Sequence, residues 1–520
     1  MKALKKAFAL LLALMLTLAL GTTAFAAGET YTITINNEAT GHTYEAYQIF
    51  AGDLAEKDGK KVLSNIVWGS GITEAGKTAL GDAAEKTKTI TTSEQAVAFA
   101  KEVAQYLTNP AESGAQADNK YTITGLSAGY YLVKDQDNTL SNTDDFYTAY
   151  IMQVVGDVEA SPKGDKPTLD KQIKHNESGK WGFVGDNQIG DTVEFRIITT
   201  IPDITGYSRP YAYKICDTMS AGLTSNVTST SDVTIKVNDS TALGSEYYSL
   251  EVDATDGNKF VLTIHVSAAV ANGALKAGDK LYTYYSGVLN ENAKVYNEGK
   301  QDNKAYLLYS NNPNGEGTGK TTEVTVYDWT FKMQVNKVDK DEKPLTGAKF
   351  VLSKNGNLKV ADMQCDENGV PTVTANLIGL VKVSDGVYRI ATDNDAADTV
   401  VYAMDAGSPV IKGLDDSTDY YLYETLAPKG YNLLDGPVQF KITAEYTTDG
   451  SALLENYPTV KVGEAEPSTN LSTNVINKEG SVLPSTGGMG TTLFYILGGL
   501  LVVGAGVVLI TRKRMSKTED

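Results

Sequence analysis

The chain has 520 residues, and its 64 Asp and Glu against 46 Lys and Arg give a net charge of −18 at pH 7. So acidic a surface repels phosphate backbones and argues against a nucleic-acid-binding protein. Only two cysteines occur, Cys216 and Cys365, and they fall in different predicted domains. A disulfide framework is therefore excluded, and an exported protein of this kind must be stabilised in another way.

The first 26 residues have the pattern of a secretory signal peptide. Lysines precede an apolar stretch from Ala7 to Leu20, and Ala24-Phe25-Ala26 is a cleavage site of the A-x-A type. We expect cleavage after Ala26 and export of the remaining chain, whose length suggests about three domains.

An N-terminal domain is expected over residues 27–160. Runs such as Tyr31 to Ile35 and Tyr121 to Thr124 are rich in Thr, Tyr and Ile, alternate in polarity and are separated by turn residues. This pattern is typical of a β-sandwich. One helix is predicted from Ser93 to Leu107, capped by Thr92 and apolar along one face.

A linker at residues 161–167 separates this domain from a middle domain. Pro162 and Lys163 follow the strand-like run Tyr150 to Val155. Proline keeps the following residue out of a sheet ladder, which would expose Lys163. An ordinary solvated linker lysine is the alternative, and Lys166 is a close neighbour.

In the middle domain, residues 168–326, polar residues fall on strand faces that are otherwise apolar, because residues two apart share a face. Lys171 shares its face with Leu169 and Ile173, and Asp217 shares its face with tyrosines and Ile215. Asn311 lines up with alternate apolar residues that precede it, although Asn312 competes for the role.

The C-terminal domain, residues 327–480, repeats this arrangement. Lys337 shares an apolar face with Val335, Glu424 with Leu422, and Asn477 with Val475. Lysine stands in the first strand and asparagine in the last. An edge lysine, a solvent-facing acid and a hydrogen-bonded asparagine are the ordinary reading of each residue taken alone.

Burial of such a set favours a specific reaction. Desolvation lowers the pKa of a lysine and raises that of an acid, and burying both as ions costs several kcal/mol. A neutral amine can then attack the asparagine amide while a protonated carboxyl polarises that amide and shuttles protons. Ammonia leaves, and a Lys–Asn isopeptide bond remains. The N-terminal domain has no lysine in its first strand and has Lys134 where the acid would stand, so we expect no bond there.

The C-terminus combines three signals in order. Leu483-Pro484-Ser485-Thr486-Gly487 precedes an apolar segment, residues 493–511, and a basic tail, residues 512–520. The apolar run provides ~27 Å of helix, enough to cross a bilayer, and the basic tail stays in the cytoplasm. This combination resembles the sorting signal of Gram-positive surface proteins. The resemblance implies that a sortase cleaves after Thr486 and transfers its acyl group to an amine. A single-pass membrane protein with an accidental pentapeptide is the alternative.

Two further resemblances give the domains an identity. Gln334 to Val338, Leu345 to Phe350 and the E-box-like Tyr421 to Tyr431 resemble a collagen-adhesin (Cna) B-type domain. Asp170-Lys171, Lys214 to Thr218 and Tyr309 to Pro313 resemble the middle domain of Gram-positive shaft pilins. The implied fold is mainly β: tandem immunoglobulin-like sandwiches, one N-terminal helix and a C-terminal transmembrane helix. The implied bonds are Lys337–Asn477 with Glu424 as the acid, and Lys171–Asn311 with Asp217.

The expected function is that of a major pilus shaft subunit, without enzyme activity. Lys163 would accept Thr486 of the next copy, although the tyrosine of the family's usual Tyr-Pro-Lys is missing here. Expected partners are pilus-type and housekeeping sortases, further copies of the chain, peptidoglycan and ancillary pilins. The expected location is the cell wall, after a transient membrane intermediate. A wall-anchored adhesin or tip pilin is the alternative.

No cofactor or metal is expected from the sequence. Glycine-rich stretches lack a nucleotide-binding context, and the three histidines are scattered. Asp393, Asp395 and Asp398 lack the glycine and terminal glutamate of an EF-hand loop.

Overall fold

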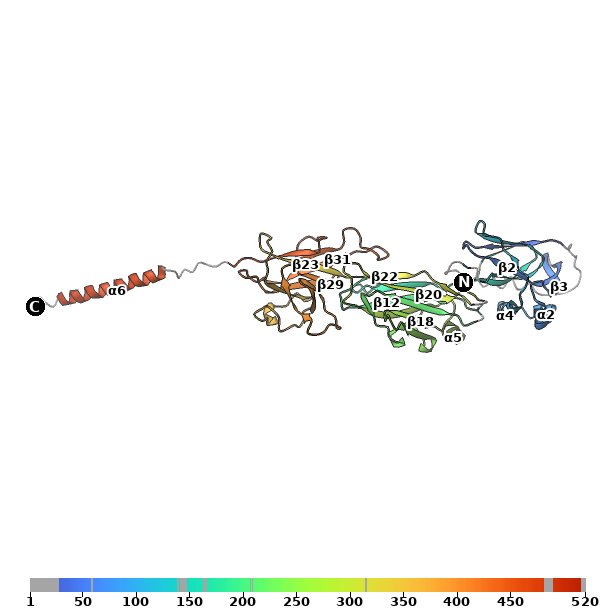
Figure 1. The fold of residues 1–520 in the computed structure, drawn as a ribbon, viewed down its shortest axis with the longest axis horizontal. Helices are drawn as coiled ribbons and strands as arrows, with labels where there is room; N and C mark the ends of the chain where they lie inside the picture. Colours follow the sequence, from blue (N-terminus) through green and yellow to red (C-terminus); the bar gives the residue numbers. More distant parts are fainter. Residues whose placement is uncertain are drawn as a thin grey trace.

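The computed structural model describes residues 28–57, 59–137, 140, 147–161, 166–205, 207, 209–313, 316–480 and 490–515. It is elongated, with three β-rich domains in a row and the helix α6 at the C-terminal end (Figure 1). The predicted signal peptide with Ala26, the linker residue Lys163 and the whole pentapeptide Leu483 to Gly487 lie outside the described residues.

The N-terminal domain is built on two sheets, one of order β5-β1-β8 and one of order β3-β2-β6-β7, with β4 paired to β2. One apolar core lies between the sheets, and a second lies under the helices. The strands are β1 (Tyr31–Asn36), β2 (Tyr44–Lys57), β3 (Lys60–Trp68), β4 (Ala111–Glu112), β5 (Lys120–Leu126), β6 (Gly129–Asp135), β7 (Ala149–Val154) and β8 (Val158–Ala160).

The prediction of a single helix in this domain is wrong. The helix α4 (Ser93–Val103) forms where expected, with a capping box between Thr92 and Gln95, and continues as a 3₁₀ turn. Two shorter helices precede it, α2 (Glu74–Leu80) and α3 (Ala83–Lys88). They are too short to show a clear apolar period, but the side chains of Thr73 and Asp82 cap them.

The middle domain is a sandwich of two larger sheets. One has the order β10-β9-β12-β19-β15-β16 with β14 beside β19, and the other has the order β11-β22-β20-β13-β18-β17 with β21 beside β20. Its elements are β9 (Leu169–Lys174), β10 (Trp181–Gly182), β11 (Val184–Asp186), β12 (Thr192–Thr200), β13 (Tyr213–Met219), β14 (Leu223–Ser225), β15 (Thr234–Val237), β16 (Thr241–Ala242), β17 (Tyr248–Val252), β18 (Lys259–Ile264), α5 (Val266–Ala271), β19 (Lys280–Leu289), β20 (Gln301–Ser310), β21 (Thr318–Lys320) and β22 (Val324–Trp329).

The C-terminal domain is a smaller sandwich, with sheets of order β27-β25-β26-β29-β23-β33 and β28-β24-β30-β31-β32. Its strands are β23 (Phe331–Val338), β24 (Ala348–Ser353), β25 (Leu380–Ser384), β26 (Val387–Ile390), β27 (Val400–Val401), β28 (Ala403–Ala406), β29 (Val410–Leu414), β30 (Asp419–Leu426), β31 (Val438–Thr443), β32 (Thr459–Val462) and β33 (Ser472–Ile476). The mainly β, multi-sandwich fold expected from the sequence is thus confirmed.

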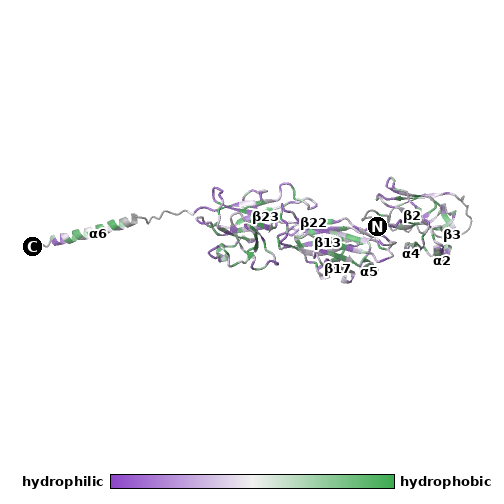
Figure 2. Ribbon diagram, viewed as in Figure 1, coloured by the Kyte–Doolittle hydropathy of each residue, from purple (hydrophilic) through white to green (hydrophobic). Residues whose placement is uncertain are grey.

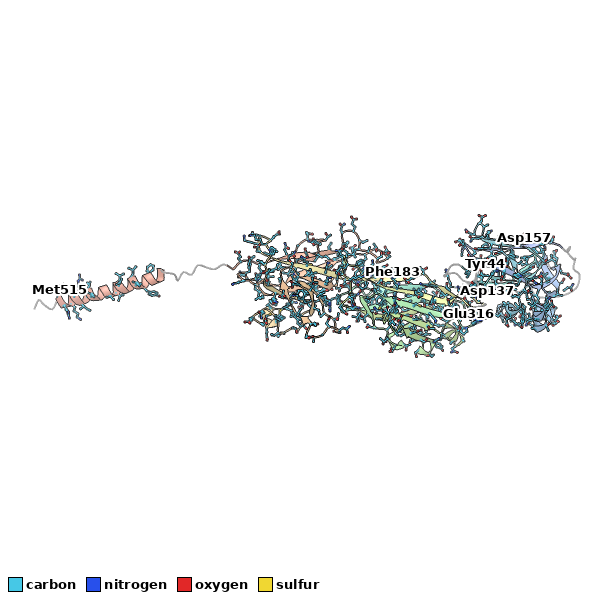
Figure 3. All side chains as sticks on the ribbon, in the orientation of Figure 1. Tyr44, Asp137, Asp157, Phe183, Glu316 and Met515 are labelled. Atoms are coloured by element: carbon cyan, nitrogen blue, oxygen red, sulfur yellow. The ribbon has the colours of Figure 1, made fainter. Side chains whose placement is uncertain are left out.

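The two C-terminal sandwiches pack end to end. Their buried apolar residues form one continuous cluster, whereas the N-terminal domain has cores of its own. The expected boundary at residues 326 and 327 falls inside β22, so the chain changes domain at Thr330 instead. Phe183 lies at this junction, and Glu316 lies at the opposite end of the middle domain (Figure 3).

Beyond the last sandwich lies α6 (Gly490–Met515). Its segment Phe494–Met515 has a mean hydropathy of 2.3 and is long and apolar enough to cross a membrane. Hydrophobic residues cover much of its length (Figure 2), and Arg512, Lys513 and Arg514 occupy its last turn.

Candidate bond-forming sites

In the C-terminal domain, Lys337 and Asn477 meet between neighbouring strands. β23 and β33 are parallel, and Lys337 is in register with Val475, two residues before Asn477. The Lys337 Nζ donates to the side-chain Oδ1 of Asn477 and, at 2.9 Å, to the carbonyl of Val475. The amine of the first strand therefore contacts the amide of the residue that follows the last strand.

Glu424 reaches the same point from the facing sheet. It lies on β30, and both of its carboxylate oxygens accept hydrogen bonds of 3.0 Å from Asn477 Nδ2. Its Oε1 lies 3.6 Å from Lys337 Nζ. The amide of Leu434 donates to Oε2 at 2.9 Å and fixes the carboxylate in this position. One carboxylate thus contacts the amine and the amide nitrogen that would leave.

The set is dry. Lys337, Glu424 and Asn477 are 0%, 2% and 1% exposed, respectively. Burial lowers the pKa of Lys337, while the neighbouring Glu424 acts in the opposite direction. Loss of water therefore favours the neutral, nucleophilic amine that the proposed reaction needs.

In the middle domain, Lys171 and Asp217 form the equivalent buried pair. Lys171 lies on β9, and its Nζ contacts Asp217 of β13, in the facing sheet, and the hydroxyl of Tyr285 on β19. Tyr285 in turn donates to Asp217 Oδ2 at 2.5 Å. Burial lowers the pKa of Lys171 and raises the pKa of Asp217, so desolvation works toward a neutral amine and a protonated acid.

The structure does not bring Asn311 to this pair. Asp217 is in register with Ala305 on β20, and Asn311 lies six residues further along, ~20 Å away at the rise of a strand. There the backbone carbonyl of Asn311 accepts a hydrogen bond of 2.7 Å from Tyr147 of the N-terminal domain. The pairing of Lys171 with Asn311 is corrected accordingly, and Asn312 stands one residue further along the chain from Ala305, the residue in register with Asp217.

Asn303 stands where Asn311 was expected. It lies on the same face of β20, two residues from Ala305, and is 1% exposed. Its Nδ2 donates to the Tyr285 hydroxyl at 3.2 Å, and its side chain is one of the hydrogen-bonding groups that stabilise the Asp217 carboxylate. The buried set of the middle domain is therefore Lys171, Asp217, Asn303 and Tyr285. Asn303 and Asn311 are an even number of residues apart, so the argument from strand faces fits both of them equally.

The N-terminal domain lacks a comparable arrangement in its described part. The inward residues of β1 are Tyr31, Ile33 and Ile35. Lys134 is buried, but its recorded partners are Glu45 at 3.4 Å, Asp137 at 3.2 Å and a backbone carbonyl. Among the described contacts of this lysine there is no carboxamide that it could attack.

The sequence also missed a group of acids between the middle and C-terminal domains. Glu177, Asp186, Asp415 and Asp416 each place one carboxylate oxygen within 4.8 Å of the others. Glu177 and Asp186 precede Asp415 and Asp416 by more than two hundred residues, so no local sequence motif indicates the group. By contrast, Asp395 in the acidic loop considered above is paired with Arg389.

Comparison with known proteins identifies two regions of the chain. Residues 331–453 match the prealbumin-like fold domain SpaA, and residues 476–517 match the LPXTG cell wall anchor motif. The first range covers most of the C-terminal domain, including Lys337 and Glu424. The second begins just before Asn477 and includes the pentapeptide and α6.

Relatives extend the likeness over more of the chain. The trypsin-resistant surface T6 protein of Streptococcus pyogenes serotype M6 is 25% identical over 361 residues, 63% of this chain and 65% of that protein. The match therefore spans just under two thirds of that relative's length. Fimbrial subunit type 1 of Actinomyces viscosus is 24% identical over 438 residues, which are 77% of this chain and 76% of that protein.

Among solved structures, the T6 backbone pilin of serotype M6 S. pyogenes shares the fold. It has a TM-score of 0.51 and 16% identity over 88% of this chain and 100% of that one, and it is described as a modular three-domain structure. The chain thus carries a prealbumin-like SpaA domain and an LPXTG cell wall anchor, and its relatives are surface and fimbrial proteins of Gram-positive bacteria.

Proposed function

We propose that this chain is the major subunit of a covalently polymerised pilus shaft anchored to the cell wall. A sortase would cleave between Thr486 and Gly487 and join Thr486 to Lys163 of the next copy. The LPXTG anchor, the fimbrial and surface relatives and the row of three β domains support this role. The observation that carries it furthest is the buried Lys337, Glu424 and Asn477 set next to the anchor.

In the C-terminal domain the proposed reaction is an amide exchange within the chain. The Lys337 Nζ lone pair attacks Cγ of Asn477, and a new C–N bond forms. Glu424 carries a proton from Nζ to Nδ2, both of which it already faces. The Cγ–Nδ2 bond then breaks and ammonia leaves. No cofactor is needed and the reaction occurs once per molecule, which fits a structural protein better than an enzyme.

In the middle domain we assign the bond to Lys171 and Asn303, with Asp217 as the acid. The raised pKa of Asp217 supports a protonated carboxyl that can polarise the amide and pass a proton to the leaving nitrogen. Tyr285 contacts Lys171, Asp217 and Asn303, so it would hold the three reacting groups in one geometry.

The two bonds shorten the path of a pulling force. Force entering at Thr486 would reach Asn477, cross to Lys337, and continue through the domain junction and β20 to Asn303. It would then cross to Lys171 and leave at Lys163. The long segments between the bonded residues are bypassed and need not unravel. Each bond also closes a loop of more than a hundred residues, worth about 4–5 kcal/mol by analogy with disulfides.

Replacement of Lys163 tests the shaft role. In the native host, Lys163→Ala should abolish the high-mass covalent ladder, while Lys166→Ala, three residues away, should leave it intact. Loss of the ladder only in the first variant supports the shaft subunit. An unchanged ladder in Lys163→Ala would refute this lysine, and the absence of any ladder in the wild-type strain would favour a wall-anchored adhesin.

A further inference from the structure

A pocket of carboxylates lies where the middle and C-terminal domains meet. Glu177 follows β9, and Asp186 ends β11, both in the middle domain. Asp415 and Asp416 follow β29 in the C-terminal domain. One oxygen from each of the four lies within 4.8 Å of the other three, so each domain contributes two acids to a single point.

Three of these acids have a buried oxygen without a hydrogen-bond donor. Asp186, Asp415 and Asp416 are at most 3% exposed, and the Oδ1 of each has no partner among the described residues. Their Oδ2 atoms are held in place, by Tyr446 at 3.2 Å, Asn176 at 3.0 Å and the amide of Ala444 at 3.0 Å, respectively. The carboxylates are therefore fixed, with one buried oxygen of each left to accept a further interaction.

The surrounding charges do not balance this group. Within the described part of the chain, His175 is the only basic residue that forms an ion pair with any of the four acids. Buried acids without a counter-charge are costly, and a bound cation removes that cost.

We propose that this junction binds one divalent cation, and that the cation is calcium. Carboxylate oxygens are the ligands that calcium prefers, at a distance of ~2.4 Å, so two of its ligand atoms can be at most about 4.8 Å apart. The observed spacing of the four oxygens fits that limit. Glu177 is exposed whereas the three aspartates are buried, which gives the ion an entrance from solvent.

A cation held this way would join the two domains. Breaking the junction would separate Glu177 and Asp186 from Asp415 and Asp416, and would leave buried acids without a counter-charge on both sides. Existing contacts already link these faces, such as Tyr420 to Gln188 at 3.0 Å and Lys412 to Glu298 at 2.8 Å. The site is a property of a single chain, so it does not depend on polymerisation.

Calcium titration of the full-length chain, purified in detergent and stripped with a chelator, tests the site by isothermal calorimetry. Asp416→Asn removes a buried ligand, and Asp398→Asn removes an exposed aspartate of the same domain as the matched control. We expect wild type and Asp398→Asn to bind one equivalent more than Asp416→Asn, or to bind it at least about tenfold more tightly, with a dissociation constant of ~10⁻³ M or below.

A second measurement shows whether the variant folds. In chelator, Asp416→Asn should melt no lower than wild type, because it relieves repulsion among buried acids, and added calcium should raise the melting temperature of wild type alone. Wild type that takes up no calcium, or Asp416→Asn that matches it in equivalents and affinity, would overturn the proposal. If Asp416→Asn melts lower in chelator, the same comparison with Asp186→Asn decides the case.

Discussion

The middle and C-terminal domains bury the same reactive groups in two different topologies. In the C-terminal domain, Lys337 lies on β23 and Asn477 directly follows the adjacent parallel strand β33 of the same sheet, and only Glu424 comes from the other sheet. In the middle domain, Lys171 lies in one sheet, whereas Asp217 and Asn303 lie in the facing sheet. The first bond would tie two strands within a sheet, and the second would tie two sheets together.

The difference suggests that the chemistry depends on a dry set of amine, acid and amide rather than on a fixed strand order. The surroundings differ in a matching way. Lys337 lies 5.9 Å from the centre of the Phe350 ring, an apolar neighbour. Lys171 contacts the hydroxyl of Tyr285. Among the described contacts, only the middle-domain set therefore adds a further side chain, Tyr285, that hydrogen-bonds to the reacting groups.

The largest effect is expected from Lys337→Met, which keeps the volume of the side chain but removes the amine. The chain should regain the mass of one ammonia and lose about 4–5 kcal/mol of unfolding free energy with the closed loop. Intact mass and denaturant unfolding measure both changes. Lys332→Met, on the outer face of the same strand, should retain the ammonia loss. It should change the unfolding free energy by no more than about 1 kcal/mol, because its partner Glu298 is solvent-exposed. An unchanged mass in Lys337→Met would contradict the C-terminal bond.

Two asparagine variants distinguish the positions along β20. Asn303→Ala should raise the intact mass by removing one ammonia loss, beyond the mass difference of the substitution itself. Asn311→Ala should retain both losses, because this residue lies ~20 Å from the level of Asp217. The opposite result would restore the pairing that the sequence suggested.

Tyr285→Phe should have the smallest effect, and only in the middle domain. It removes the hydroxyl that contacts Lys171, Asp217 and Asn303, so the middle-domain bond should form more slowly after synthesis. Time-resolved mass spectrometry of newly made chains would follow one ammonia loss lagging behind the other. Equal rates for the two losses would show that the hydroxyl does not position the reacting groups.

The contrast between the two domains also shows what the sequence could predict. Lys337 and Asn477 follow from face parity because they stand at the ends of the first and last strands of their domain, and Glu424 follows because it shares a face with Leu422 on β30. On β20, parity recurs every second residue, so it fits both Asn303 and Asn311. Only the register between β13 and β20 separates them, and register depends on the packed sheet.

The short helices and the acids of the domain junction could not be predicted from the sequence for related reasons. The helices α2 and α3 have six or seven residues each, so their caps were the sole local signal. The acids of the domain junction come from three separate segments, two in the middle domain and one in the C-terminal domain, and meet only after the two sandwiches pack together. Long, alternating strands, by contrast, were predicted within a few residues, as for β1 and β5.

The central claim is that each of the two sandwiches next to the anchor closes one bond between a buried lysine and a buried asparagine. The most direct test is to measure the intact mass of the mature chain released from the wall, and then to digest it and sequence its peptides by tandem mass spectrometry. We predict an intact mass lower by two ammonia molecules, with crosslinked peptides joining Lys337 to Asn477 and Lys171 to Asn303. An unshifted mass with both lysines in linear peptides would contradict the account.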